Sequence, residues 1–288
     1  MSKLELENVS FVYGKGTPFE KAAVKNVSVS FDEQATIGVI GHTGSGKSTL
    51  VQMLNGLYKP TSGRVLFDGK DINENKKDLR SLRFKVGLVF QYPEYQLFEE
   101  TVEKDVGYGP KNMGLPADEI AARVRRAVEF TGLDLSVLQK SPFELSGGQK
   151  RRVAIAGVLA MEPEVLILDE PAAGLDPAGR ETILGEIENW RRANGATVIV
   201  VSHSMEEIAN HCDRILVLNK GELYKYGTPK EIFGESERLS EFGLEAPQVT
   251  RLCNLLREKG IALPRDIYTV DDAFGAIEAA FKGVGADA

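Results

Sequence analysis

A glycine-rich loop that ends in a lysine and a serine predicts a site for the phosphates of a nucleotide. Residues 41–48 have the form GxxxxGKS and are followed by a threonine. The glycines let backbone N–H groups turn toward an anion, the lysine brings a cation to the β and γ phosphates, and the serine hydroxyl can ligate Mg²⁺. The predicted nucleotide-binding residues of this loop are Gly41, His42, Thr43, Gly44, Ser45, Gly46, Lys47, Ser48 and Thr49.

A second glycine-containing motif begins a helix further along the chain. Residues 145–149 read Leu-Ser-Gly-Gly-Gln, and the serine and the glutamine have the spacing of a capping box that opens a helix through Leu159. The bare N–H groups at such a helix start form an anion site in their own right. A monomer would therefore leave one of its two phosphate-binding sites unused. The residues of this motif are Leu145, Ser146, Gly147, Gly148 and Gln149.

Two adjacent carboxylates end an apolar run and predict the place where water is activated. The run 165–168 is followed by Asp169 and Glu170. At the end of a buried strand, Asp169 suits coordination of Mg²⁺ through water, and Glu170 would sit beside the γ phosphate and polarise the attacking water. Two solvated carboxylates at a strand end are common on their own. The LSGGQ motif before them and the sequence Pro-Ala-Ala-Gly-Leu-Asp after them favour the catalytic interpretation.

Two further polar residues follow predicted buried strands. His203 comes after the apolar run 197–201, and Gln91 comes after the strand predicted at 85–90. Sheets of alternating α/β proteins place ligand-binding groups at the carboxyl ends of their strands. A lone histidine is more often structural, so His203 needs the order of the surrounding motifs to count as a site residue.

The elements that would position these residues alternate between strands and helices. Continuous apolar runs predict strands buried on both faces, and alternating apolar and polar residues predict half-buried strands. Strand and helix alternation around a phosphate loop argues for a three-layer α/β core with a parallel sheet. The predicted strands are 4–13, 27–31, 36–40, 85–90, 165–169, 197–202 and 214–218, and the predicted helices include 48–57, 147–159 and one that begins after Asp176 and stops at Gly195.

The composition is that of a globular protein without an excess of lysine and arginine. The 288 residues are 42% hydrophobic and 27% charged, and the formal net charge is −7. This acidic balance disfavours nucleic acid as a partner. Spanning a bilayer takes about 20 mostly apolar residues, which no segment approaches. With two cysteines and no secretory signal at the N-terminus, the sequence predicts a cytoplasmic protein whose membrane role would come through partners.

The last fifty or so residues predict a small helical appendage. One apolar stripe is formed by Val249, Leu252 and Leu255, and a second helix would be opened by Thr269 and Asp272. The stripe of the second helix is Val270, Phe274, Ile277 and Phe281. The predicted division is therefore a main domain at 1–235 and a C-terminal helical extension at 236–288.

Taken in this order, the two glycine motifs and the carboxylate pair resemble the ATPase cassette of ATP-binding-cassette (ABC) proteins over residues 3–235. The resemblance implies the fold of a P-loop NTPase with an antiparallel β subdomain and a helical subdomain at about 91–160. It also implies ATP and Mg²⁺ as cofactors. Tyr13 is similar to the A-loop aromatic that stacks on adenine, and His203 to the switch histidine that contacts the γ phosphate. Gln91 is similar to the Q-loop glutamine.

The same resemblance assigns the remaining site residues and a partner chain. Two cassettes pair head to tail, so that each LSGGQ signature covers the ATP held by the other chain's phosphate loop. Ser48, Gln91 and Asp169 are the implied metal ligands. Gly174, Leu175 and Asp176 correspond to the D-loop.

Local features narrow the resemblance to the ATPases of energy-coupling-factor (ECF) transporters. The Q-loop continues as QYPEYQLF through Phe98, and the insertion at 16–20 is similar to that of the second of the two ATPase subunits. The tail is similar to the helical extension through which the two ATPases contact each other. This resemblance implies a sibling ATPase, a membrane scaffold and exchangeable substrate-binding membrane subunits for vitamins or other micronutrients. It places the chain at the cytoplasmic face of the membrane, as a peripheral protein.

Two alternatives remain open from the sequence. One is the ATPase of a conventional ABC importer or exporter. The other is a soluble ABC ATPase of translation or DNA maintenance, although such translation factors carry two cassettes and the DNA-maintenance proteins carry a long coiled-coil insertion. Neither feature appears in this chain, and every catalytic position is filled.

Overall fold

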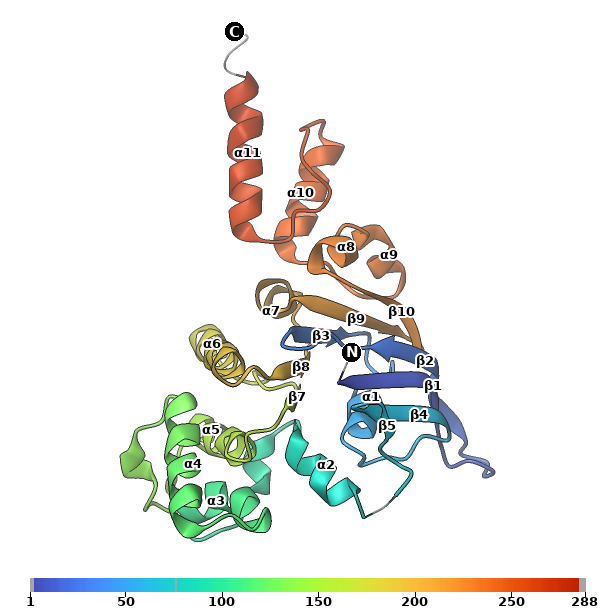
Figure 1. The fold of residues 1–288 in the computed structure, drawn as a ribbon. Helices are drawn as coiled ribbons and strands as arrows, with labels where there is room; N and C mark the ends of the chain where they lie inside the picture. Colours follow the sequence, from blue (N-terminus) through green and yellow to red (C-terminus); the bar gives the residue numbers. More distant parts are fainter. Residues whose placement is uncertain (1–2, 76, 285–288) are drawn as a thin grey trace.

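A six-stranded sheet forms the centre of the molecule. The computed structural model describes residues 3–75 and 77–284 (Figure 1). The strand order is β10-β9-β3-β8-β7-β6, with β10 antiparallel to β9 and the other neighbours parallel. Since β3, β7 and β8 are apolar throughout apart from their terminal polar residues, they are buried along their whole length. The strands are β3 (Thr36–Ile40), β6 (Val86–Val89), β7 (Val165–Asp169), β8 (Thr197–Val201), β9 (Arg214–Asn219) and β10 (Glu222–Gly227).

A second, antiparallel sheet of four strands lies beside the first. Its order is β2-β1-β4-β5. Helix α1 (Lys47–Leu54) contributes Leu50, Val51 and Met53 to one apolar core shared with this sheet and with β3. The antiparallel sheet therefore holds the helix that follows the phosphate loop. Its strands are β1 (Leu4–Tyr13), β2 (Lys21–Ser30), β4 (Ser62–Phe67) and β5 (Lys70–Asp71).

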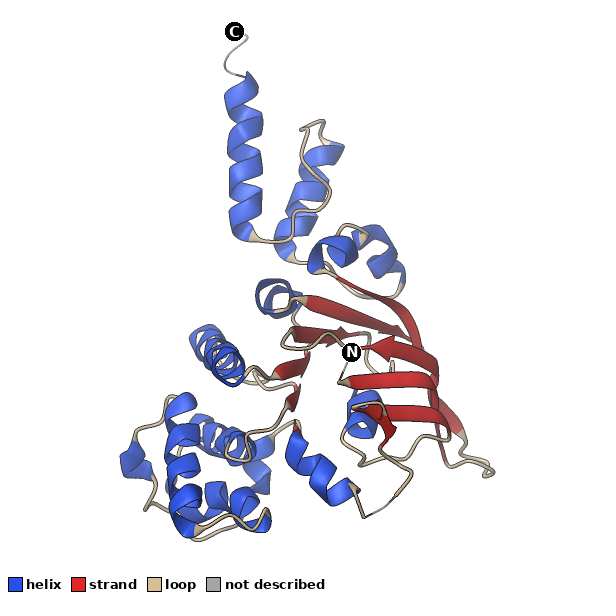
Figure 2. Cartoon of the chain, in the orientation of Figure 1, coloured by secondary structure: helices blue, strands red, loops and turns tan. Residues whose placement is uncertain are grey.

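The helical region predicted at 91–160 does not have a core of its own. Val106, Val128 and Val153 from its helices pack in the same apolar cluster as Leu166 of β7 and Trp190 of α6 (Pro177–Asn194). The helices in Figure 2 that lie to the lower left are thus continuous with the sheet through this cluster. The elements before α6 are α2 (Leu79–Lys85), η1 (Pro93–Gln96), α3 (Val102–Asn112), α4 (Ala117–Phe130), η2 (Leu135–Val137), η3 (Pro142–Glu144) and α5 (Gly147–Leu159).

Several element boundaries differ from the predicted ones for local reasons. Helix α1 ends at Leu54 rather than at Leu57, because the Asn55 side chain donates to the carbonyl of Val86 and Gly56 adopts a left-handed conformation. Strand β2 begins at Lys21, well before the predicted 27–31, since it pairs with β1. Helix α2 was not predicted, and it buries only Leu82.

The C-terminal segment divides into two packing units. Leu239, Leu244 and Ala246 share a cluster with Ile208 and Phe233 of the main body, so the boundary predicted at 235/236 falls inside a packed region. The helices α10 and α11 form a separate small cluster and project from the body in Figure 1. The helices after α6 are α7 (Met205–His211), α8 (Pro229–Phe233), α9 (Ser236–Glu241), α10 (Gln248–Glu258) and α11 (Val270–Val284).

The two apolar stripes predicted in the tail are only partly covered. Ile277 packs against the small cluster, whereas Phe274 is 70% exposed and Leu255 is 57% exposed. The hydroxyl of Thr269 accepts a hydrogen bond from the N–H of Asp272 at 3.2 Å, as its spacing predicts for a helix start. Among the described residues, no helix has the length and apolar character that crossing a membrane requires.

Candidate active site

A pocket of about 390 Å³ brings together side chains from both sheets and from the loop before α1. It lies at the carboxyl ends of β7 and β8, where α/β sheets place ligand-binding groups. Residues that are far apart in the sequence thus share one concave site. The predicted site residues that line it are Tyr13, Thr43, Gly44, Gly46, Lys47, Ser48, Thr49, Gln91, Asp169, Glu170 and His203.

The glycines of the phosphate loop are required by close approaches of the backbone. Gly46 has a φ of 102°, and a Cβ added there would lie 2.3 Å from the carbonyl oxygen of Ala23. A Cβ on Gly41 would lie 2.5 Å from the carbonyl oxygen of Leu218. No other residue type could follow this path, so the loop is held tightly between β2 and the end of β9.

Lys47 is a buried cation at the first turn of α1. It is 6% exposed, and its ammonium donates to the carbonyl oxygen of Gly41 at 2.7 Å. A weaker contact to the carbonyl oxygen of His42 spans 3.3 Å. Burial lowers the pKa of Lys47, while the charges of Glu170 and Asp169 oppose that change. The ammonium is therefore held by carbonyls of the loop, and Lys47 lines the pocket.

Asp169 and Glu170 line the same pocket, at the end of β7. Burial raises the pKa of Asp169, although a hydrogen bond from Ser48 opposes the increase. Burial, together with the charge of Asp169, raises the pKa of Glu170 to about 7. Glu170 has a φ of 55°, and its N–H donates to the carbonyl oxygen of Val201 at 3.0 Å. A carboxylate in this setting is poised between its acid and base forms near neutral pH.

The buried oxygen Oε1 of Glu170 has no hydrogen-bond partner, although Nε2 of His203 lies 3.2 Å away. Burial lowers the pKa of His203, and the charge of Lys47 lowers it further. The pair therefore faces the pocket with unused hydrogen-bonding capacity. Gln91 lines the same pocket from the loop after β6, and its side chain is exposed.

The residues present fit a magnesium ion. The Ser48 hydroxyl and the Asp169 carboxylate are already hydrogen-bonded to each other, so two oxygen donors lie side by side next to the phosphate loop. Oxygen donors of this kind suit Mg²⁺, which binds through one or two protein ligands together with phosphate and water. Gln91 would be the third donor on this side of the pocket.

Tyr13 stands at the edge of the pocket. Its hydroxyl shares a hydrogen bond of 2.9 Å with Oγ1 of Thr49, and its ring makes edge contacts with Phe11 and Tyr58. The ring is 39% exposed, which leaves an aromatic surface next to the phosphate loop.

The LSGGQ residues do not line this pocket. In Figure 1 the strands β7 and β8 lie between α5 and α1. Ser146 accepts a hydrogen bond from the N–H of Gln149 at 3.3 Å, and Gln149 Oε1 accepts one from the N–H of Ser146 at 3.1 Å. This is the capping box that the sequence predicts. Leu145 is buried in the core, whereas Gly147 and Gly148 are exposed, and a Cβ added to either glycine would meet no atom within 4 Å.

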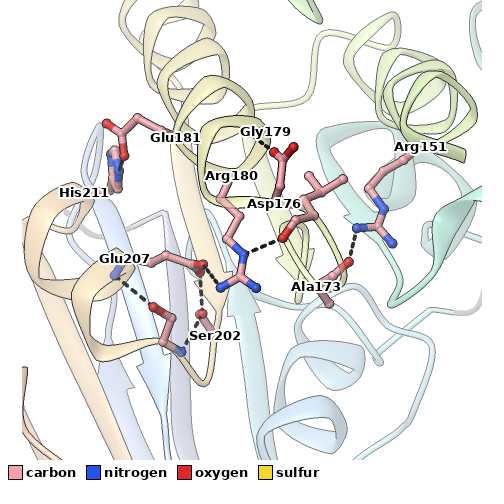
Figure 3. Close-up of polar contacts among 11 residues, drawn as sticks. Arg151, Ala173, Asp176, Gly179, Arg180, Glu181, Ser202, Glu207 and His211 are labelled. Atoms are coloured by element: carbon pink, nitrogen blue, oxygen red, sulfur yellow. Dashed lines mark hydrogen bonds and ion pairs between the residues drawn. The ribbon is translucent and has the colours of Figure 1, made fainter.

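The predicted D-loop residues also lie outside the pocket, in the loop that follows Glu170. Asp176 caps α6 by accepting from the N–H of Gly179 at 2.7 Å (Figure 3). Gly174 has a φ of 76°, and Leu175 packs at the edge of the core. The D-loop is thus continuous with the carboxylate wall of the site.

Sequence reasoning missed several residues of the site. Lys21 and Ala23 of β2 line the pocket because β2 pairs with β1 and so comes back to the phosphate loop. No local signal marks these two contacts, since each depends on segments distant in the sequence.

Three of the predicted nucleotide-binding residues lie outside this pocket. Gly41 and His42 line a neighbouring cavity of about 810 Å³, together with His203 and residues of the C-terminal segment. Ser45 is buried within the phosphate loop.

Comparisons with known proteins agree with this geometry. The model of the ABC transporter family matches residues 24–173, and a model described as an AAA domain, putative AbiEii toxin, Type IV TA system, matches residues 139–209. The energy-coupling factor transporter ATP-binding protein EcfA2 of Caldanaerobacter subterraneus subsp. tengcongensis is 52% identical, over 94% of each chain. The protein of the same name from Clostridium perfringens (strain 13 / Type A) is 53% identical, over 95% of this chain and 96% of that relative.

Solved structures of ABC transporter ATPases are also similar to this chain. The cbiO1 protein of Clostridium perfringens, described as part of the ABC transporter complex cbiONQ, has a TM-score of 0.75 and 40% identity, over 89% of this chain and 99% of that chain. The dimeric structure of MJ0796, a bacterial ABC transporter cassette, has a TM-score of 0.71 and 30% identity, over 78% of this chain and 98% of that chain. The chain therefore belongs to the family of energy-coupling factor transporter ATP-binding proteins, within the ABC transporter ATPases.

Proposed function

We propose that this chain is the ATP-hydrolysing subunit of an ECF transporter that takes up vitamins or other micronutrients. Its family consists of ATPases that couple ATP hydrolysis to transport. The observation that carries the proposal is the pocket in which Lys47, Asp169 and Glu170 meet, with the pKa of Glu170 raised to about 7. A group that can take up a proton near neutral pH is what water activation requires.

In the proposed mechanism each side chain has one task. Lys47 neutralises the β and γ phosphates of ATP, and the aromatic ring of Tyr13 covers the adenine. Glu170 polarises the attacking water, and His203 contacts the γ phosphate from beside Glu170. Ser48, Gln91 and Asp169 would hold Mg²⁺, which would supply positive charge beside the phosphate oxygens. The reaction depends on positioning and charge stabilisation rather than on a covalent intermediate.

The signature motif supports a partner ATPase. Gly147 and Gly148 are exposed at the start of α5, away from the chain's own pocket, and their backbone N–H groups face solvent. An anion site of this kind is suited to phosphates held by another chain. We propose a head-to-tail pair with a sibling ATPase, to which the D-loop residues Gly174, Leu175 and Asp176 also contribute.

An exposed aromatic cluster beside Gln91 supports a membrane scaffold as the second partner. Tyr95 is 85% exposed and Phe98 is 58% exposed, and both lie within a few residues of Gln91. Exposed aromatic side chains grouped in this way are typical of protein interfaces. We propose that the scaffold contacts this cluster, and that the chain is a peripheral protein at the cytoplasmic face of the membrane.

The test is to purify a tagged copy from detergent-solubilised membranes and to measure ATPase activity. We expect a second LSGGQ-containing ATPase, a polytopic scaffold and smaller substrate-binding membrane subunits to co-purify. In that complex Glu170→Gln should keep ATP binding and lower turnover by about 10² to 10⁴, the range for loss of a general base.

Replacing both Tyr95 and Phe98 with serine serves as the test of the docking surface. This variant should bind ATP normally and lose the scaffold. Recovery of the wild-type chain with ribosomes or DNA and without any membrane protein would overturn the transporter proposal. Near wild-type turnover of Glu170→Gln would remove Glu170 from the mechanism.

A further inference from the structure

The loop between Glu170 and α6 is held between two arginines that come from opposite sides. Arg151 of α5 donates from Nη1 to the carbonyl oxygen of Ala173. Arg180 of α6 donates from Nε to the carbonyl oxygen of Leu175 at 2.9 Å. Figure 3 shows the two guanidinium groups directed at this loop from separate elements. Residues 171–176, here termed the clamped loop, therefore have two of their carbonyls fixed by charged donors.

Arg151 is itself anchored on the segment that follows Gln91. Its Nε and Nη2 donate to the two carboxylate oxygens of Glu94, at 3.2 Å and 3.0 Å. Arg151 is only 5% exposed, and although burial opposes the change, its hydrogen bond and charge hold the pKa of Glu94 below the usual range. The two residues thus form a bidentate ion pair that is largely shielded from solvent. The two parallel hydrogen bonds of such a pair fix its geometry.

Arg180 is anchored on the segment that carries His203. Its Nη1 lies 3.8 Å from Oε1 of Glu207, and Oε2 of Glu207 accepts a hydrogen bond of 2.7 Å from the Ser202 hydroxyl. The same hydroxyl accepts from the N–H of Ser204 at 3.0 Å. The two serines flank His203, so Arg180 connects the clamped loop to the backbone on both sides of that histidine.

The position of the clamped loop matters because it begins at the proposed catalytic carboxylate. Glu170 has a left-handed φ, and its carbonyl oxygen accepts from the N–H of Ala173 at 3.2 Å, within the same turn. A displacement of the loop therefore moves the Glu170 carboxylate. An error of about 1 Å in such a group can lower a rate by about 10²-fold.

We propose that Arg151 and Arg180 are positioning residues for ATP hydrolysis, which together fix the clamped loop and hence the carboxylate of Glu170. Because each arginine also pairs with one carboxylate, the position of Glu170 depends on Glu94, near Gln91, and on Glu207, near His203. This inference rests on the proposed ATPase function. It adds two residues that do not line the ATP pocket and that act through the backbone of the loop.

The test uses the purified transporter complex with Arg151→Met and Arg180→Met, each of which keeps the aliphatic stem and removes the donors. We expect kcat to fall by about 10- to 100-fold, while KM for ATP changes by less than about 3-fold, because the phosphate loop is untouched. The matched control is Arg192→Met, on the same helix as Arg180. Arg192 pairs with Glu188 on the surface and its side chain is 67% exposed, so its removal should change kcat by less than about 2-fold.

Two further variants separate positioning from general loss of structure. Arg180→Lys keeps the charge and a donor for the Leu175 carbonyl, and it should recover part of the lost kcat. The double variant Arg151→Met with Arg180→Met should lose less than the product of the two single losses, since both act on one loop.

The outcomes are distinguishable. A wild-type complex without ATPase activity would refute the proposed function itself. An active wild-type complex in which the two arginine variants match Arg192→Met, or in which KM rises while kcat stays constant, would refute the positioning role alone. A simple product of the single losses would show that the arginines act independently and would refute the shared loop.

Discussion

Two helices in this chain begin with a glycine-containing turn, and they differ in what surrounds that turn. At the start of α1, Lys47 is buried and the carboxylates of Asp169 and Glu170 face the same pocket. At the start of α5, Gly147 and Gly148 are exposed. Both turns offer backbone N–H groups at the positive end of a helix dipole. The first turn is completed by side chains of its own chain, whereas the second has its backbone N–H groups turned outward.

The two turns also differ in their energetics. The pKa of Glu170 is raised and that of Lys47 is lowered, both chiefly by burial, so each charged form is disfavoured in the folded state. The turn before α5 satisfies the N–H groups of Ser146 and Gln149 through the reciprocal hydrogen bonds of these two residues. The pocket beside the turn before α1 therefore holds two charges, on Lys47 and Glu170, that burial disfavours. The turn before α5, in contrast, stabilises its own helix.

The largest expected effect is a loss of ATP affinity when the lysine of the turn before α1 is replaced, but not when the lysine near the turn before α5 is replaced. Lys47→Ala removes charge-assisted contacts to two phosphates, each of about 1.5–3 kcal/mol, so ATP affinity should fall by about 10³-fold. The matched control is Lys150→Ala, which removes the lysine near the signature turn and should change affinity by less than about 2-fold. Titration calorimetry of the purified chain measures both. If Lys150→Ala lowered ATP affinity as much as Lys47→Ala, the assignment of the ATP site to the turn before α1 would be contradicted.

The next effect concerns the free energy of unfolding and the carboxyl of Glu170, which follows β7 and lines the pocket beside the turn before α1. Glu170 titrates at about 7 in the folded chain against 4.5 as the ordinary value, so between these pH values the folded state holds more protons than the unfolded state. The free energy of unfolding therefore decreases as pH rises through this window, by at most about 3 kcal/mol. Glu170→Gln removes the charge, and at about pH 8 it should raise the free energy of unfolding by up to that amount.

Urea unfolding of the nucleotide-free chain at several pH values measures this difference. The gain of Glu170→Gln should shrink as pH falls from about 7 toward about 4.5, because the wild-type carboxyl then becomes protonated in the folded state. The exposed residue Glu258 provides the control, since Glu258→Gln should give no such gain. If Glu170→Gln lowered the free energy of unfolding at alkaline pH, the buried charge of Glu170 would not destabilise the folded chain, and the prediction would be wrong.

The smallest effect concerns the signature turn. Ser146→Ala removes the side-chain acceptor of the capping box, and the free energy of unfolding should fall by about 1 kcal/mol. ATP affinity of the isolated chain should not change, because Ser146 does not line the pocket. Ser146→Thr keeps a hydroxyl at the cap and should lose much less stability. If Ser146→Ala weakened ATP binding by the isolated chain, the proposed separation of the two turns would be wrong.

Much of the fold could be predicted because its signals are local. The strands at 4–13, 36–40 and 165–169 have the predicted bounds, since their residue patterns are continuous from end to end. The start of α6 after Asp176 and its end at Gly195 are also as predicted, because caps are set by single residues. The short helix α2 buries one residue and therefore carries no periodic signal.

The parts of the site that could not be predicted depend on contacts across the chain. Glu94 and Arg151 meet only because η1 packs against α5, and neither residue stands out in its own segment. In the same way, Ala23 reaches the pocket through strand pairing. Predicted site residues such as Lys47, Asp169 and Glu170 do share a pocket, since the carboxyl ends of neighbouring parallel strands lie at one edge of a sheet.

The packing of Leu239, Leu244 and Ala246 has a practical consequence for dissecting the protein. These side chains cover Ile208 and Phe233, so a chain cut near Gly234 would leave apolar residues of the main body open to water and prone to aggregation. A cut after Ala246 would remove α10 and α11 with their own small cluster and leave that cover in place. We therefore expect a chain that ends at Pro247 to keep the cover over Ile208 and Phe233, apart from the contact that Tyr268 makes with Phe233.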